Sequence, residues 1–408
     1  MTGRSILLLA LLSASLAIAP AVAQKRYDPG ASDKEIKIGN IMPYSGALSA
    51  YALNGRAEAA FFRKLNDEGG INGRKINFIS YDDGFSPSKT VEQARKLVES
   101  DEVLLIFQSL GTPTNNAIQK YLNEKKVPQL FVGTGATKFG DPKNFPWTMG
   151  WQPTYQTEGR IYAKYILQNL PQAKIGILYQ NDDSGRDYLK GLKDGLGDKT
   201  AKRMIVAELP YDPTDPTVDS QIVTLKTMGA DVFFNEATAK FAAQAIRKAA
   251  EIGWKPIQFV ASISNSFGSV YKPAGLENSR GVLSAVYLKD PTDQSWKDDP
   301  AIHEWLAFMD KYFPDGDKSS TFSVYGYLTA QTLAQVLKQC GDDLTRANVM
   351  KQAANLKNLE LDLLLPGIKI NTSPSDYFPI KQMQLTRFNG QHGELVGPLM
   401  TGEIRTDQ

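Results

Sequence analysis

The chain has 408 residues, of which 42% are hydrophobic and 10% aromatic, a composition typical of a globular protein. This length exceeds what one hydrophobic core usually serves, so two lobes are expected. The 46 basic and 44 acidic residues leave a net charge of +2, which gives no electrostatic basis for binding nucleic acid.

The first residues have the pattern of a secretory signal peptide. Arg4 supplies a positive charge, Ile6–Ala19 is apolar, and Ala21–Ala23 has the small residues of a cleavage site. The apolar run is shorter than the roughly 20 residues that a membrane span needs, and no later segment is long and apolar enough. We therefore expect cleavage after Ala23 and export of the mature chain as a soluble protein.

After this leader, segments with strand and helix patterns alternate. Strands are expected at residues 36–42, 75–81, 103–107 and 129–132. Helices are expected between them, at residues 50–66, 87–100 and 113–125. This alternation indicates βαβ units and a parallel sheet.

The same pattern starts again after Gly150–Trp151, where we place a lobe boundary. Strands are expected at residues 174–179, 202–209, 230–235, 257–261 and 281–287, with helices at 155–170, 187–196, 217–228 and 238–252. Three further helices and two strand-like segments follow, at residues 300–313, 320–339, 345–354, 368–371 and 382–389. Three consecutive helices suggest that the chain crosses back into the first lobe and then returns to the second.

Two turns of the first lobe have the features of an anion-binding site. Residues 104–117 are interpreted as a buried strand, a loop of small and hydroxyl residues, and a helix that starts near Pro113. The start of a helix leaves backbone N–H groups unpaired, and the helix dipole adds partial positive charge there. A second such turn, Val132–Thr137, follows one strand later. Open α/β sheets hold ligands at such neighbouring strand ends, so the sequence predicts a cradle for a carboxylate or another anion.

Residues suited to catalysis or metal binding are sparse. The two histidines, His303 and His392, lie far apart, so neither a histidine metal site nor a Ser/His/Asp set can be assembled. Cys340 is the only cysteine, which excludes an intramolecular disulfide and favours a buried structural thiol. Residues 133–140 resemble a dinucleotide-binding loop but lack its third glycine. We therefore expect no catalytic residues, no metal and no cofactor, and hence no enzyme.

Five segments carry a family resemblance, and they are Ile38–Gly46, Leu65–Lys75, Tyr81–Pro87, Asp212–Thr217 and Met228–Phe234. Together they resemble the branched-chain amino-acid (leucine/isoleucine/valine) family of periplasmic substrate-binding proteins. The resemblance extends from about Lys34 to Gly402. It implies a type I periplasmic-binding fold, an α/β protein with two lobes, each a mostly parallel sheet flanked by helices. It also implies a ligand in the cleft between the lobes and delivery to the membrane subunits of an ABC transporter.

The resemblance further implies how the chain is divided. Apart from residues 1–23, the signal peptide predicted above, residues 34–150 with 288–364 are expected to form the first lobe, and residues 151–287 with 365–408 the second. Three hinge crossovers are expected near residues 149–152, 285–289 and 363–367. The family also implies a periplasmic monomer whose lobes close round the ligand.

The family's carboxylate-holding positions fall on Gly111, Thr112, Gly135 and Thr137, and Thr137 keeps the family's hydroxyl. These positions belong to the two turns identified above from backbone physics. Two separate arguments therefore lead to one carboxylate site.

The positions that hold the α-ammonium in the family's amino-acid binders differ in this chain. A family Tyr is replaced by Ala237 and a family Glu by Ile263, although Glu236 restores the acid if the alignment shifts by one residue. An unpaired ammonium buried in a closed cleft costs several kcal/mol. The difference favours a carboxylate that lacks the amine.

The other candidate site residues are aromatic and amide side chains at loops expected to face the cleft. They are Tyr44, Phe85, Trp151, Gln152, Tyr155, Asn181 and Asn235, with Trp151 expected to contact the ligand or the hinge. Flat apolar walls with a few oriented polar groups suit aromatic acids. We therefore expect an aromatic or hydrophobic monocarboxylate. A branched-chain or other amino acid is the alternative, and an amide-type ligand sensor of the same fold is the third hypothesis.

Overall fold

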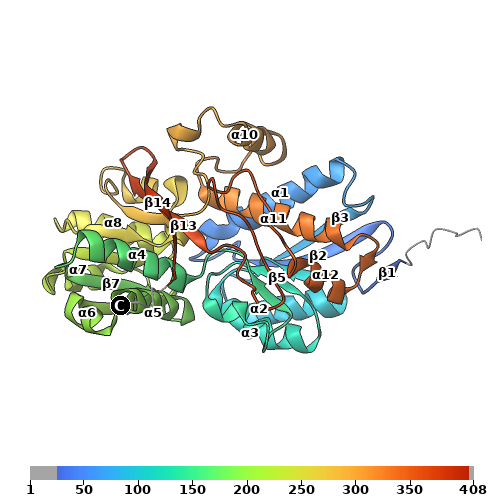
Figure 1. Cartoon of the computed structure of the whole chain (residues 1–408), viewed down its shortest axis with the longest axis horizontal. Coiled ribbons are helices and arrows are strands. Elements are labelled where there is room, and N and C mark those ends of the chain that lie inside the picture. The colour runs from blue at the N-terminus through green and yellow to red at the C-terminus, as the bar shows by residue number, and fades with distance from the viewer. Residues whose placement is uncertain (1–24, 404–408) are drawn as a thin grey trace, which may run out of the picture.

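A computed structural model describes residues 25–403 as two α/β units side by side, each built on its own sheet (Figure 1). The signal peptide predicted at residues 1–23 lies outside the described part. Within residues 25–403, none of the helices combines the length and the apolar character needed to cross a bilayer.

The first sheet has five parallel strands in the order β3-β2-β4-β5-β6. The strands are β2 (Glu35–Met42), β3 (Lys75–Asp82), β4 (Leu105–Phe107), β5 (Gln129–Val132) and β6 (Thr148–Gly150). Both β4 and β5 are buried along their whole length, as expected for central strands covered by helices on both faces. The carboxyl ends of these two strands lead into the two turns singled out in the sequence.

Within residues 25–403, six helices accompany this sheet, although three of them come from much later in the chain. The helices are α1 (Ala52–Asp67), α2 (Pro87–Arg95), α3 (Thr112–Glu124), α10 (Pro300–Tyr312), α11 (Thr321–Cys340) and α12 (Arg346–Ala353). The long helix α11 packs along α1, and α12 packs against α11. The guanidinium of Arg346 on α12 donates to the carbonyl oxygens of Leu104 and Val103, which ties α12 to the sheet. A short pairing of β1 (Arg26–Tyr27) with β12 (Asp343–Leu344) adds a further contact.

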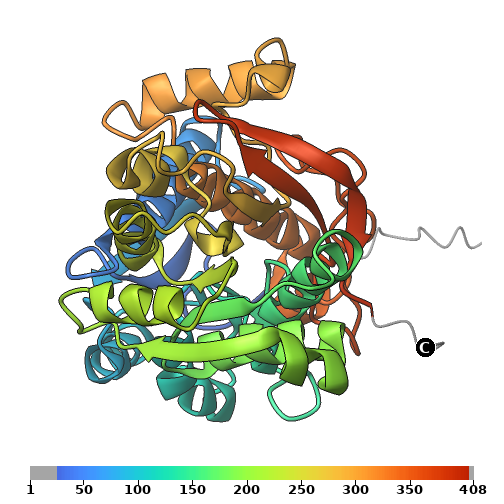
Figure 2. The ribbon, with the colours of Figure 1, turned by 90° about the vertical axis from the view of Figure 1, so that its left-hand side faces the viewer.

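The second sheet has seven strands in the order β14-β13-β11-β10-β9-β7-β8. They are β7 (Ile175–Gln180), β8 (Ile205–Tyr211), β9 (Val232–Glu236), β10 (Ile257–Val260), β11 (Leu283–Val286), β13 (Gln382–Phe388) and β14 (Gly393–Thr401). The five strands from β7 to β11 are parallel, and β13 and β14 add an antiparallel pair at the edge. Figure 2 shows this pair as the red ribbons at the right-hand edge of the molecule.

The second unit also has six helices in the described residues. They are α4 (Tyr155–Asn169), α5 (Asp183–Leu196), α6 (Asp198–Met204), α7 (Asp219–Thr227), α8 (Ala239–Glu251) and the single turn α9 (Lys272–Ala274). Helices α4 and α5 pack closely because Gly159 and Gly191 allow their backbones to approach. A Cβ on Gly159 would lie 2.6 Å from the backbone nitrogen of Leu192 on α5.

Three segments differ from the expectation drawn from the sequence. The strand expected at 202–209 begins only at Ile205, because residues Asp198–Met204 form a helix after Gly197, whose φ is +75°. Residues 368–371 form no strand, and Ile370 makes only an isolated bridge with Leu359. Strand β14 was not expected, because Gly393, Gly397 and Pro398 are residue types typical of turns and uncommon in strands.

The chain passes between the two units after β6, after β11 and before β13, and the three passages lie together. Lys289 N donates to the carbonyl oxygen of Leu363, and Leu365 N donates to that of Tyr287, so two passages pair with each other. The third carries Trp151, whose ring lies 6.1 Å from that of Tyr287. The lobe boundaries at residues 150, 287 and 364 stay a prediction.

Candidate functional site

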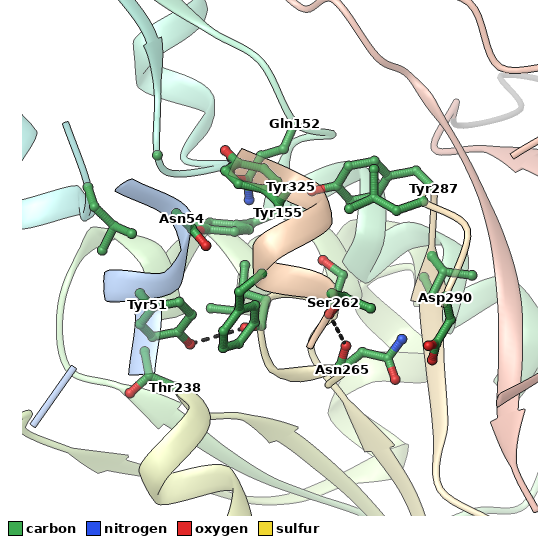
Figure 3. Close-up of a pocket in the computed structure, with 18 of the residues that line it drawn as sticks. Tyr51, Asn54, Gln152, Tyr155, Thr238, Ser262, Asn265, Tyr287, Asp290 and Tyr325 are labelled. Carbon is green, nitrogen blue, oxygen red and sulfur yellow. Dashed lines mark hydrogen bonds between the residues drawn. The ribbon is translucent and has the colours of Figure 1, made fainter. Parts of the chain in front are cut away.

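A cavity of about 100 Å³ lies between the two units, several times the space that one water molecule needs. Residues of both units line it, as do residues of the passages between them (Figure 3). Tyr51, Asn54 and Tyr325 come from the first unit, and Thr238 and Ser262 from the second. The described structure therefore has the inter-lobe cavity that the sequence predicts.

The N-terminus of α3 opens onto this cavity through Gly111 and Thr112. Gly111 has a φ of +102°, and a Cβ there would lie 2.3 Å from the ring of Phe85, so this position requires glycine. Phe85 itself has a φ of +62°, and its backbone N–H donates to the Oδ1 of Asp83 at 2.8 Å. The close approach places an aromatic ring beside a helix N-terminus, which suits an acid with an apolar body.

Aromatic side chains form much of the cavity wall. The ring of Tyr155 stacks on that of Tyr188 at 4.3 Å, and the ring of Tyr51 lies 4.7 Å from that of Phe322. Burial raises the pKa of the Tyr51 phenol to about 12, so this hydroxyl stays protonated at neutral pH. These walls are apolar and carry no charge.

Direct hydrogen bonds join the two units around the cavity. The Tyr51 hydroxyl donates to the carbonyl oxygen of Ile263 at 3.1 Å and accepts from the backbone N–H of Ala239 at 3.0 Å. The Thr321 hydroxyl at the start of α11 donates to the carbonyl oxygen of Asn265 at 2.8 Å. The two units are thus in direct contact with each other at the cavity.

A buried carboxylate positions the part of the second unit that lines the cavity at Ser262. The backbone N–H and the hydroxyl of Ser262, which lines the cavity, both donate to Glu158 at 2.6 Å. The hydroxyls of Tyr162 and Tyr188 also donate to Glu158, at 2.8 and 3.2 Å. Burial raises the pKa of Glu158 to about 7, although these four donors act in the opposite direction. Glu158 therefore fixes the turn Ser262–Ser264 without reaching the cavity.

Charges around the cavity are few and are all negative. None of the described residues that line it is Lys, Arg or His, whereas Asp290 and Asp293 both line its hinge-side end. Lys289, which lies beside them in sequence, is paired with Asp299 at 2.6 Å. Burial raises the pKa of Asp290. Any anion bound here would therefore be held by backbone and neutral side-chain donors.

Five of the residues predicted from sequence line the cavity together, namely Phe85, Gly111, Thr112, Tyr155 and Ile263. Gln152, which was expected to face the cleft, also lines it and accepts from the Tyr325 hydroxyl at 2.9 Å. The hydroxyls of Thr112 and Thr134 form a hydrogen bond with each other at 2.6 Å. Whether these residues touch the ligand stays a prediction.

Thr137 lies at a different place, on the outer side of the contact between the units. Its backbone N–H and its hydroxyl both donate to the Oδ2 of Asp187 on α5, each at 2.7 Å. Next to it, Lys138 pairs with Asp183 at 3.1 Å. The Thr137 hydroxyl thus joins the two units in this structure rather than lining the cavity. Gly135, two residues earlier, packs under Tyr155 and also lies outside the lining.

Trp151 is fully buried in the hinge and does not line the cavity. Its indole N–H donates to the Thr332 hydroxyl at 2.9 Å, and its ring meets that of Tyr325 edge to face at 5.3 Å. Tyr44 and Asn181 are also absent from the lining. The Tyr44 hydroxyl bonds to that of Ser80, and the Asn181 N–H donates to the carbonyl oxygen of Tyr211.

Asn235 and Glu236 end β9 and are buried behind the cavity wall, not in it. The Asn235 amide donates to the carbonyl oxygen of Ala242 at 3.4 Å. Neither carboxyl oxygen of Glu236 has a hydrogen-bond partner in the described structure. Burial, followed by repulsion from Glu158, raises the pKa of Glu236 well above the usual range of a glutamate. Glu236 thus lies behind the cavity wall, and its role as a partner for a ligand ammonium stays a prediction.

Several lining residues were not found from sequence, among them Asn54, Thr238, Ser262, Asn265, Tyr287, Asp290 and Tyr325. Tyr287 and Asp290 follow the end of β11, where the chain passes to the first unit. Strand ends of open α/β sheets hold ligands, and this position is the signal that could have identified both residues. Tyr325 lies within α11, whose first half is buried throughout, so no amphipathic pattern distinguishes its cavity-facing side.

Comparison with known proteins assigns the class of this chain. A family model described as "Periplasmic binding protein" matches residues 35–393. The Leu/Ile/Val-binding protein homolog 1 of Brucella abortus is 27% identical over 348 residues, which is 82% of this chain and 87% of that protein.

Two solved structures share the fold. A branched-chain amino-acid ABC transporter protein from Thermus thermophilus with bound valine has a TM-score of 0.80 at 16% identity, covering 90% of this chain and 97% of that one. A solute-binding protein of an R. palustris ABC transporter, in complex with benzoate, has a TM-score of 0.75 at 17% identity, covering 90% and 98%.

The chain therefore belongs to the periplasmic binding protein family, and it is similar to proteins named as Leu/Ile/Val-binding protein homologs. Its fold is the two-lobed type I periplasmic-binding fold, as the sequence predicted. Members of this family bind small molecules in the periplasm and work with ABC transporter components, and the relatives are binding proteins rather than enzymes. No cluster of three or more possible metal-ligating side chains occurs in residues 25–403.

Proposed function

We propose that this protein captures a small aromatic or hydrophobic monocarboxylate in the inter-lobe cavity and delivers it to an ABC importer. The observation that carries the proposal is the α3 N-terminus, which opens onto a cavity walled by aromatic rings. The Gly111 N–H already donates to the carbonyl oxygen of Gly133, so the Thr112 N–H and the positive end of the helix dipole support a carboxylate here. Phe85, Tyr155 and Phe322 offer apolar surface to the rest of the ligand.

The absence of cationic lining supports a singly charged acid. With no Lys, Arg or His among the described lining residues, a second carboxylate on the ligand would be buried without a counter-charge. Asp290 and Asp293 would repel it further. The benzoate carried by the R. palustris protein of the same fold is consistent with this ligand class.

A branched-chain or other amino acid is the second candidate, favoured by the same two aspartates. An α-ammonium needs an anionic or strongly accepting partner inside a closed cavity, and Asp290 and Asp293 are the acids that line this one. Glu236, the other candidate partner, lies behind the wall. The valine bound by the T. thermophilus protein is an example of such a ligand on this fold.

A thermal-shift panel with the purified mature chain separates the two candidates. The panel compares benzoate, 3-phenylpropanoate, leucine and valine at matched concentrations, because ligand at 100 times its Kd adds roughly 2.7 kcal/mol of stability. We expect an aromatic acid to raise the melting temperature and the amino acids to leave it unchanged. If leucine or valine alone stabilises the protein, the monocarboxylate proposal is wrong.

A further inference from the structure

The two threonines expected at the acid site have hydroxyls that are already committed within the protein. Thr137 donates to Asp187, and Thr112 forms a hydrogen bond with Thr134 at 2.6 Å. The Thr134 hydroxyl in turn donates to the Tyr155 hydroxyl at 3.2 Å. A hydroxyl has one proton, so Thr134 has none left for Thr112, and Thr112 donates to Thr134. The Thr112 hydroxyl therefore has no proton to offer to a ligand.

This series of hydroxyls ends at Tyr155, whose own proton is free. The Tyr155 hydroxyl accepts from Thr134 and has no acceptor for its proton within residues 25–403. Tyr155 lines the cavity and is 4% exposed, and its backbone N–H donates to the carbonyl oxygen of Gly135 in the second turn at 2.8 Å. Burial raises the pKa of this phenol, so the hydroxyl keeps its proton at neutral pH.

Gln152 provides a second unpaired donor beside the same turn. The Tyr325 hydroxyl accepts from the Gln108 amide at 2.7 Å and donates to the Oε1 of Gln152 at 2.9 Å, which fixes the orientation of the Gln152 amide. Its Nε2 has no hydrogen-bond partner in the described part of the chain and keeps exposed surface at the cavity, which Gln152 lines (Figure 3). A Cβ on Gly133 would lie 2.9 Å from the Oε1 of Gln108, so these bonded side chains rest on the second turn.

Both free donors lie where the α3 N-terminus opens onto the cavity, because the Gly111 N–H joins the two turns by donating to the carbonyl oxygen of Gly133 at 3.1 Å. No Lys, Arg or His is among the described lining residues, so an acid group depends on neutral donors. A carboxylate has two oxygens that only accept, which suits one O–H and one N–H donor. A primary amide would instead bring two N–H groups to a place where protein donors are unpaired.

We propose that the Tyr155 hydroxyl and the Gln152 amide N–H donate to the carboxylate of the ligand and select an acid over the corresponding amide. This inference rests on the proposed function and deepens it, because it assigns recognition of the acid to these two side chains rather than to threonine hydroxyls. A carboxylate bound in this way joins the Thr112 N–H of the first unit to Tyr155 on α4 of the second. Binding of the acid thereby favours contact between the units.

Calorimetric titration of the full mature chain compares each acid with its primary amide. The probes are benzoate with benzamide, and 3-phenylpropanoate with 3-phenylpropanamide. Each pair differs only in the group that meets the two donors. We expect at least one acid to bind about tenfold more tightly than its amide, because hydrogen bonds to a charged group are stronger than those between neutral groups.

Two variants remove one donor each and keep a side chain of similar shape. Tyr155→Phe retains the ring that stacks on Tyr188, and Gln152→Met retains the length of the side chain. Each should bind the acid roughly tenfold more weakly and the amide with a smaller loss, so the preference for the acid falls. Tyr377→Phe is the matched control, since it removes a buried phenol outside the lining, and it should bind every probe as the native chain does.

The outcomes distinguish failure of this inference from failure of the proposed function. If neither acid binds the native chain, the proposed function fails and the inference falls with it. If an acid binds but its amide binds equally well, the function stands and the inference is overturned. Equal losses for acid and amide in both variants, or an unchanged affinity for the acid in either, would likewise overturn it. Melting of each ligand-free variant checks folding, and if Tyr155→Phe fails to fold, Gln152→Met carries the test.

Discussion

Individual residues in this protein are tuned by burial more than by contacts between opposite charges. Glu58 and Glu236 are completely enclosed, and burial raises the pKa of both. Glu158 is equally buried but accepts four hydrogen bonds, and its pKa rises only to about 7. Burial of these acids costs stability, and part of that cost is offset at Glu158 because it holds Ser262 at the cavity.

The buried glutamates predict an inverse dependence of stability on pH. A carboxyl whose pKa is raised in the folded state binds its proton more tightly when folded, so the fold gains stability as the pH falls from 8 toward 5. Glu158 is the charged group whose repulsion acts on Glu236, and burial raises its own pKa as well. We expect Glu236→Gln to raise the free energy of unfolding at pH 8, because a neutral amide removes the cost of burying an ionised carboxyl at this position.

Urea unfolding at pH 8 and at pH 5.5 measures this effect. The stability difference between the two pH values should shrink in Glu236→Gln, while Glu304→Gln, at an exposed position of α10, should behave as the native protein. A variant less stable than the native protein at pH 8 would contradict a raised pKa of Glu236 in the folded state.

Gly111 makes a second prediction at the residue scale. In Gly111→Ala the new Cβ would lie 2.3 Å from Phe85 and 2.6 Å from the Thr114 hydroxyl, at a φ of +102°. We expect a loss of roughly 1 to 3 kcal/mol of stability together with weaker ligand binding, because the ring must leave the cavity wall. Gly150→Ala, whose Cβ would meet nothing within 4 Å, is the matched control in thermal melting and titration.

At the scale of elements, the short helix η3 (Thr137–Gly140) and α5 form a contact between the units on the outer side of the cavity. Asp187 on α5 accepts from the backbone and hydroxyl of Thr137 and also from the Gln156 amide. Tyr51 makes the corresponding contact on the cavity side. Ligand binding that requires the units to close therefore depends on residues that do not touch the ligand.

Asp187→Ala tests this dependence. Loss of two hydrogen bonds to Thr137 should destabilise the closed arrangement by about 1 to 2 kcal/mol, which weakens ligand affinity by roughly five- to thirty-fold. Most of the change is expected in the dissociation rate, measured by stopped-flow fluorescence. Asp194→Ala on the same helix removes ion pairs to Arg160 and Lys190 within one unit, and it should leave affinity unchanged. Equal losses in both variants would show that α5 is merely destabilised.

At the scale of the whole molecule, the fold is held together by segments distant in sequence. The second sheet gains β13 and β14 only after the chain has built helices α10 to α12 on the first unit (Figure 1). Strand β13 pairs with β11 and places Met383, Leu385 and Phe388 in the core. Neither unit is therefore complete until the chain has passed between them three times.

Removal of residues 382–408 is expected to prevent folding. It would leave the edge of β11 unpaired and expose apolar core surface, which favours aggregation. Soluble yield and circular dichroism of the shortened chain measure the outcome, with a chain that ends at Glu403 and keeps both strands as the control. A soluble, cooperatively unfolding product of the shorter chain would contradict this dependence.

The sequence by itself determined the alternating elements, the parallel parts of the two sheets and the turn at Gly111–Thr112, because these follow from local periodicity and from helix ends. It also identified the family through short motifs in their order along the chain. Only the tertiary structure decided which side chains share the cavity. Trp151 lies in the hinge and Thr137 at the contact between the units, whereas Asn54 and Tyr325 line the cavity. The reason is that a local pattern fixes a residue's element and face, whereas its neighbours depend on how distant segments pack.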